Sequence, residues 1–448
     1  MKNIFKYTLL AAGCAVAILS TACTEETYAE QDKGATPVVK YVRPCDINLS
    51  DSLLTGASLG QQIAFVGDNL GDVQQVWFND KKALLSPNLV TSHTIIVNVP
   101  NAIPGEVTGQ ARLITSTGIE VSYPFDVTVP APRVEKMDCE YAHAGDVVTI
   151  EGAYFADDPN VPLTVAIGGV QAEIRTLAQD KLEVVVPEGA SEGPVVVTSI
   201  YGKGESGFNY MDTRGMLFDF EPDGLTGLGM GGQCWHARPT RSDDLSISGN
   251  YMIIGNGEKE LSENADWDDT NYSFEYWAGS WNTPTDYPAR VGERLFDVVD
   301  FTDFNEKCVK FELYIPASNA WQAGAMQLFF SPVSMVSLGN PGTDVFGDAV
   351  AGSNNSFFDS KEKGGYGLGR YLWTPWSSSE AYHTGGKWIT LKFPIKDFVH
   401  DYDGTAATRM LSDVTDFANF DIFIWAGGVT GVACTPLFYI DNIRVVPN

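Results

Sequence analysis

Residues 37–212 consist of short runs in which apolar and polar residues alternate, and the runs stop at Gly, Asn and Pro. Alternation with a period of two is typical of strands that are buried on one face. The segment GQQIAFVG at 60–67 returns as GDVVTIEG at 145–152, and IIVNVP at 95–100 returns as LEVVVP at 182–187. The pattern therefore predicts short antiparallel strands that occur in two copies.

The two copies lie about 85 residues apart, a spacing that suits a whole small β-domain rather than one turn of a solenoid. We predict one immunoglobulin-like β-sandwich at 37–130 and a second at 131–212. Neither copy holds a cluster of aromatic residues. We therefore expect both domains to act as spacers.

Residues 215–448 contain further apolar runs of strand length, separated by long loops rich in Gly, Ser, Asn and Asp. No run of 12 residues has good helical periodicity. The strand-like runs are 216–221, 251–254, 309–315, 326–330, 388–393, 420–425 and 438–446. We predict about eight strands in a larger β-sandwich of the jelly-roll type, which makes the whole chain all-β.

The N-terminus has the pattern of a secretory signal: two lysines, an apolar run at 7–19 that is too short to cross a bilayer, and then Ser-Thr-Ala-Cys. A cysteine after a small residue resembles the bacterial lipobox, in which this residue, here Cys23, becomes lipidated. Ser20 stands where that motif usually has a large aliphatic residue, and ordinary cleavage is the alternative. We predict a signal peptide at 1–22 and a polar, lipid-anchored tether at 23–36.

Aromatic residues are concentrated in the C-terminal half. Nine of the ten tryptophans fall in 215–448. Because tryptophan is rarely fully buried, several of these rings should reach the surface. There they could stack on nucleic-acid bases, sugars or side chains of a partner protein.

Net charge excludes the first of these ligands. The chain has 29 Lys and Arg against 57 Asp and Glu, a formal charge of −28. An acidic surface without a basic stripe repels phosphate. We therefore expect no nucleic acid as partner and favour a neutral, ring-shaped ligand, which points to carbohydrate.

Several rings are candidates for a stacking platform. Trp277 and Trp281 are four residues apart, so in an extended segment they face the same side, while Tyr276 faces the other; two core rings are the alternative. Trp388 and Trp425 lie inside apolar runs and are expected in the core. The ligand-binding candidates are Trp277, Trp281, Trp235, Tyr276, Trp321, Trp373 and Trp376.

Three short motifs resemble known families. The element G-x-x-V-x-I-x-G-x-x-F at 145–155 resembles the IPT/TIG branch of immunoglobulin-like domains, although the first copy has Leu70 in place of the final aromatic. The opening strand F-x-F-E at 218–221 and the closing strand Y-I-D-N-I-R-V at 439–445 resemble carbohydrate-binding jelly rolls. With the lipoprotein start, the chain resembles the surface glycan-binding proteins of Bacteroidetes polysaccharide-utilisation loci, and most closely those that bind xyloglucan.

This resemblance implies non-catalytic capture of a plant polysaccharide, a β-glucan such as xyloglucan or mixed-linkage glucan, for import and breakdown. It implies an outward-facing location on the outer membrane through the lipid anchor, and an outer-membrane glycan transporter complex as a further partner. No cofactor is required. A structural Ca²⁺ ion is implied where the first and last strands meet, with Glu221 and Asp441 as ligands; two surface acids are the alternative.

Two other classes of function stay open. A surface glycoside hydrolase needs only two opposed carboxylates in the C-terminal domain, and sequence spacing does not identify such a pair. A protein-binding adhesin would use the same aromatic residues as an apolar anchor. The G-x-S-x-G at 56–60 and the G-x-G-x-x-G at 227–232 lack the strand and helix that a hydrolase elbow or a dinucleotide loop requires.

Overall fold

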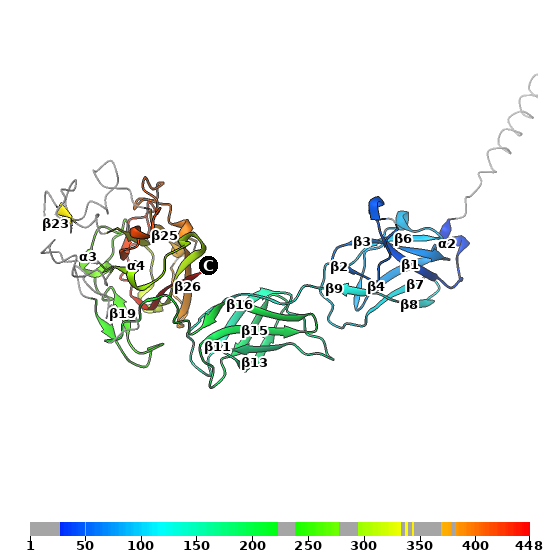
Figure 1. Cartoon of the computed structure of the whole chain (residues 1–448), viewed down its shortest axis with the longest axis horizontal. Coiled ribbons are helices and arrows are strands. Elements are labelled where there is room, and N and C mark those ends of the chain that lie inside the picture. Colours follow the sequence, from blue (N-terminus) through cyan, green and yellow to red (C-terminus); the bar gives the residue numbers. More distant parts are fainter. Residues whose placement is uncertain are drawn as a thin grey trace, which may run out of the picture. The chain divides into compact units, whose positions relative to one another are not determined.

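The computed structural model describes residues 27–49, 51–222, 238–276, 294–332, 369–378 and 381–448, together with the short strands β23 (Ser337–Leu338) and β24 (Thr343–Asp344). The fold is nearly all β, which confirms the predicted class (Figure 1). The chain forms two compact units. The first holds residues up to Pro132 with Ala156–Leu163 and Ser199–Gly202, and the second holds the rest. Within the described ranges, no helix is both long and apolar enough to span a membrane.

The first unit contains the first copy of the repeat. It has a three-stranded sheet in the order β1-β3-β6, a four-stranded sheet in the order β5-β4-β7-β8, and the parallel pair β2-β9. The rings of Phe65, Phe78 and Phe125 meet in its core, with centroids 5.7–6.2 Å apart. Its elements are α2 (Tyr28–Gln31), β1 (Val38–Pro44), η1 (Ile47–Leu49), β2 (Gly56–Ser58), β3 (Gln62–Asp68), β4 (Val73–Phe78), β5 (Lys81–Lys82), η2 (Pro87–Leu89), β6 (Thr94–Asn98), β7 (Gln110–Thr115), β8 (Glu120–Pro124) and β9 (Asp126–Thr128).

The second copy of the repeat lies in the second unit, as a seven-stranded sheet in the order β10-β11-β14-β13-β12-β15-β16. The repeated sequences form the same strand pair in both copies: β3 pairs with β6, and β11 pairs with β14, both antiparallel. The strands are β10 (Arg133–Met137), β11 (Val147–Ala153), β12 (Thr164–Ile167), β13 (Val170–Leu177), β14 (Lys181–Val185), β15 (Gly193–Ser199) and β16 (Gly202–Tyr210). We call this copy the second β-domain.

The C-terminal domain, from Met216 onward, packs two sheets face to face. One has the order β18-β19-β28-β21-β26, with β17 also paired to β28, and the other has the order β20-β27-β22-β25. The strands are β17 (Met216–Phe218), β18 (Thr240–Arg241), β19 (Tyr251–Ile254), β20 (Ser273–Tyr276), β21 (Lys307–Tyr314), β22 (Ala325–Ser331), β25 (Tyr371–Trp373), β26 (Ile389–Pro394), β27 (Asn419–Trp425) and β28 (Phe438–Pro447). Short helices connect them: α3 (Asp269–Tyr272), α4 (Leu295–Val298), η4 (Phe304–Glu306), η5 (Ala317–Asn319), η8 (Pro375–Ser378), η9 (Ile395–Asp397) and η10 (Val414–Asp416).

Candidate ligand-binding surface

The sheet β20-β27-β22-β25 has one face in the core and a second face that combines rings with polar groups. Along β27, Ile422 and Ile424 belong to the main core cluster. Because successive side chains of a strand point to opposite faces, Phe423 and Trp425 lie on the other face. We call this second face the outer face of the sheet.

A group of four rings occupies one end of the outer face. The ring of Trp267 stacks on Phe423 at a centroid distance of 4.8 Å and meets Trp425 edge to face at 5.0 Å. Tyr402 stacks on Trp425 at 4.4 Å with an angle of only 8° between the planes. We call Trp267, Tyr402, Phe423 and Trp425 the aromatic group. Among the tryptophans that the structure describes, Trp267 is the most exposed, at 37%.

The loop that carries Trp267 is held to the end of β27 by its backbone. The amide of Ala426 donates to the carbonyl of Ala265 at 3.0 Å, and Gly431 donates to Glu263 at 2.8 Å. Ala265 has a φ of 48°, a conformation that persists only when the surroundings fix it. On the far side of Trp267, the Asp268 carboxylate caps helix α3 by accepting from the amide of Asn271. Trp267 is thus positioned by fixed backbone on both sides.

Buried polar side chains support the aromatic group from below. The Gln327 amide nitrogen donates to the carbonyls of Tyr402 and Trp425, at 3.0 and 2.6 Å. Its amide oxygen accepts from Arg370 at 2.9 Å. Arg370 is fully buried and lies over the ring of Phe329 at 4.7 Å. Burial lowers the pKa of Arg370 to about 10, so this guanidinium stays charged at neutral pH.

The structure places three of the predicted platform rings in the core. Trp321 is fully buried and donates from its indole nitrogen to the carbonyl of Ala323. Trp376 is 7% exposed and donates to Gly324, and Tyr276 is 2% exposed against Phe218. In these positions, the rings leave no open face on which a sugar could stack.

Of the remaining predicted rings, Trp373 is half-buried between the rings of Trp321 and Tyr382. Three candidates lie outside the described residues: Trp235, Trp277 and Trp281. Trp277 follows Tyr276, the last residue of β20, in the sequence.

The sequence analysis missed most of the aromatic group. It assigned Trp425 to the core, whereas the ring lies half-buried on the outer face, and it gave no role to Trp267 or Tyr402. Trp388 is also half-buried; it stands immediately before β26 and packs against Tyr251 rather than in the main core. The one available signal for Trp267 was its position in an acidic, loop-like segment, ENADWDDTN at 263–271.

The two carboxylates proposed for calcium have hydrogen-bond partners of their own. Glu221 accepts from the backbone and side-chain amides of Asn250, and Asp441 accepts from the Ser248 hydroxyl at 2.8 Å. Burial raises the pKa of Asp441 well above its usual range, a condition that a bound cation would reverse. Among the described residues, no group of three or more His, Cys, Asp or Glu side chains is arranged to hold a metal ion.

Comparison with known proteins assigns the chain to a family. The family model described as surface glycan-binding protein B xyloglucan binding domain matches residues 210–447. The crystal structure of surface glycan-binding protein PbSGBP-B from Prevotella bryantii is similar, with a TM-score of 0.82 and 43% identity over 92% of this chain and 99% of that one. An SGBP-B from a complex xyloglucan utilization locus in Bacteroides uniformis has 14% identity and a TM-score of 0.42, covering 92% of this chain and all of that one.

A relative from Bacteroides ovatus, an IPT/TIG domain-containing protein, is 32% identical over 166 residues, which is 35% of this chain and 33% of the relative. The match thus spans a third of that relative's length. It agrees with the IPT/TIG resemblance of the repeat. Because the family model covers more than half of the sequence, the chain belongs to the surface glycan-binding protein B family.

Proposed function

We propose that this protein captures xyloglucan or a closely related β-glucan at the cell surface and does not cleave it. The observation that carries the proposal is the match of the xyloglucan-binding family model to nearly the whole C-terminal domain, residues 210–447. The relative from Prevotella bryantii, which is itself a surface glycan-binding protein, supports it across all the described domains.

Charge and aromatic content support the same ligand class. The net charge of −28 disfavours polyanions such as pectins and nucleic acids. A pyranose ring has an apolar C–H face that stacks on an indole, and each Å² of apolar area removed from water contributes about 25 cal/mol. An open aromatic platform of this kind reaches micromolar to millimolar affinity, about −8 to −4 kcal/mol.

For the platform itself, Trp277, Trp281 and Trp235 remain our proposal. They are aromatic residues of the domain that the family model matches, and Trp277 and Trp281 are four residues apart, a spacing that places both on one side of an extended segment. Alanine replacement of a platform ring should weaken binding by over about 1 kcal/mol and leave the melting temperature nearly unchanged.

For the location, we propose lipidation of Cys23, which would tether the domains to the outer membrane through residues 23–36. Members of a surface glycan-binding family act at the cell surface, and a lipid-anchored tether provides that position. An outer-membrane transporter that takes up the captured glycan is the partner that this role implies.

One experiment separates this function from its two rivals. The full-length mature protein is run in affinity gels that contain xyloglucan, mixed-linkage glucan or mannan, and the same incubations are assayed for reducing ends. We expect retardation by xyloglucan without release of reducing ends. Release of reducing ends would favour a glycoside hydrolase, and migration unaffected by every glycan would favour an adhesin; either result would contradict the proposal.

A further inference from the structure

We propose that Trp267 forms a subsite of its own for a neutral pyranose unit of the bound glycan. The inference rests on the proposed function, because the ligand is taken to be the same polysaccharide. It concerns a ring that lies in none of the predicted platform segments. Four observations carry it: an exposed ring, a rigid support, a polar hollow beside the ring, and the local charge.

The first two observations concern the ring. Trp267 is 37% exposed although it is packed against Phe423 and Trp425. Behind it, Trp425 is itself covered by Tyr402, and the carbonyls of these two residues are bonded to Gln327. A ring that is already held in place loses little conformational freedom on binding, so more of its contact energy appears as affinity.

The third observation is a hollow of about 590 Å³ beside the ring, within the range of small-molecule sites. Its walls offer hydroxyl, amide and carboxylate groups next to the indole. A sugar needs this combination, because its hydroxyls exchange hydrogen bonds with water for hydrogen bonds with protein. The uncharged polar residues of the lining are Ser262, Thr270 and Asn271.

The fourth observation is the charge of the hollow, which selects among ligands that could stack on an indole. Three carboxylates line it, Glu260, Asp266 and Asp268, against the single cation of Lys259. Phosphate, sulfate or uronic acid groups would be repelled. A neutral hexose or pentose unit meets no such penalty, and carboxylates are good acceptors for its hydroxyl groups.

The strand register separates this subsite from the end of β20. Tyr276 pairs with Phe420 on β27, whereas Trp425 pairs with Ala325 on β22. Trp267 contacts Phe423 and Trp425, which lie three and five residues from Phe420 on the same strand, or about 10 and 17 Å at ~3.4 Å per residue. Trp267 therefore contacts the sheet about 10–17 Å along β27 from the residue that pairs with the end of β20.

The test uses the full mature protein and isothermal titration calorimetry with xyloglucan. Trp267→Ala should weaken binding at least about fivefold, the effect of losing a hot-spot aromatic residue. Thr270→Arg places a large side chain in the hollow from an exposed position, and it should weaken binding without touching the ring. Trp77→Ala removes a half-buried indole from the first unit and should bind like wild type.

The outcomes distinguish the subsite from the proposed function. If wild type binds no glycan, the proposed function fails, whatever the variants do. If wild type binds and both Trp267→Ala and Thr270→Arg keep its affinity, the subsite is overturned while the function stands. Thr270→Arg also guards against misfolding: weaker binding by this variant at an unchanged melting temperature supports the subsite even if Trp267→Ala is unstable.

Discussion

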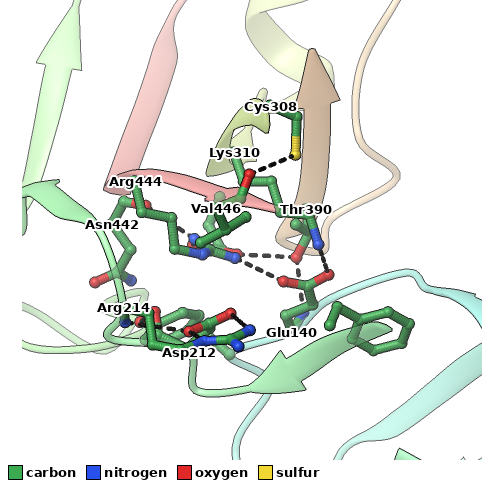
Figure 2. Close-up of polar contacts among 12 residues, drawn as sticks. Glu140, Asp212, Arg214, Cys308, Lys310, Thr390, Asn442, Arg444 and Val446 are labelled. Atoms are coloured by element: carbon green, nitrogen blue, oxygen red, sulfur yellow. Dashed lines mark hydrogen bonds and ion pairs between the residues drawn. The ribbon is translucent and has the colours of Figure 1, made fainter. Parts of the chain in front are cut away.

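Glu140 of the second β-domain should be one of the most important single residues for the stability of the C-terminal domain. Its carboxylate accepts from Lys310 at 2.5 Å and from Arg444 at 2.8 Å, and both cations belong to the C-terminal domain (Figure 2). The three side chains are 4%, 5% and 0% exposed. Arg444 also forms a bidentate pair with Glu312, at 2.8 and 3.0 Å. Truncating Glu140 to alanine therefore leaves Arg444 with one carboxylate and deprives Lys310 of its ion pair.

The magnitude follows from burial. Removing one partner of a buried ion pair costs about 3–5 kcal/mol, because the remaining charge stays desolvated. At roughly 2–4 °C per kcal/mol for domains of this size, the melting temperature of the second unit should fall on the order of 10 °C. Glu140→Gln should cost less than Glu140→Ala, since the amide oxygen can still accept one hydrogen bond.

Differential scanning calorimetry of the full chain measures this effect, and Glu135→Ala is the matched control. Glu135 lies on β10 and pairs with Arg133 at the surface, where both side chains are about half exposed or more. An exposed pair contributes about 0–1 kcal/mol, so the control should melt close to wild type. A drop for Glu140→Ala no larger than that for Glu135→Ala would refute the reasoning from burial.

Three further predictions concern other parts of the chain. Cys23→Ala should release the protein from the membrane fraction, as fractionation and protease treatment of whole cells would show; continued surface attachment would contradict lipid anchoring. Trp321→Ala should cost about 3–5 kcal/mol of stability because the ring is fully buried, whereas Trp277→Ala should reduce glycan affinity at an unchanged melting temperature. Burial raises the pKa of Asp441, so the folded state holds a proton that the unfolded state releases, and stability is lost as pH rises above about 4. In EDTA, the melting temperature of Asp441→Asn should therefore rise relative to that of wild type as pH increases from 4 to 7. A difference in melting temperature that does not change with pH would argue against a protonated Asp441. A higher melting temperature of wild type in millimolar Ca²⁺ would support the calcium site.

The strands of the repeat could be predicted from the sequence because their signal is local. In β11, the buried Val148 and Ile150 alternate with more exposed neighbours, and the glycine and proline turns around the strand limit its length. The closing strand was clear for a different reason. Apolar, mostly β-branched residues stand on either side of Asp441, Asn442 and Arg444 in 438–446 and predict a strand. The structure buries the whole of 438–446, including these three polar residues.

Continuous apolar runs explain why the positions of the rings could not be predicted. In β27, the sequence from Ile422 to Trp425 is apolar throughout, so it does not reveal that Ile424 faces the main core while Trp425 faces Tyr402. The choice depends on which strands and loops cover each face, and those come from distant parts of the chain. Trp321 shows the opposite case: it was a candidate for the binding platform, but its ring packs on Phe438 in the core.

The domain boundary near residue 212 is therefore a boundary of sequence pattern rather than of packing. The carboxylate that neutralises Arg444 from the second β-domain lies 304 positions earlier in the chain, and no local pattern could indicate that pair. Thr390 of the C-terminal domain adds backbone contacts: its hydroxyl accepts from the amide of Glu140, and its amide donates to the carbonyl of Asp138. A spacer that only separated two domains would need none of these bonds. The second β-domain instead covers the polar side of the six-stranded sheet of the C-terminal domain, so the two pack as one compact unit.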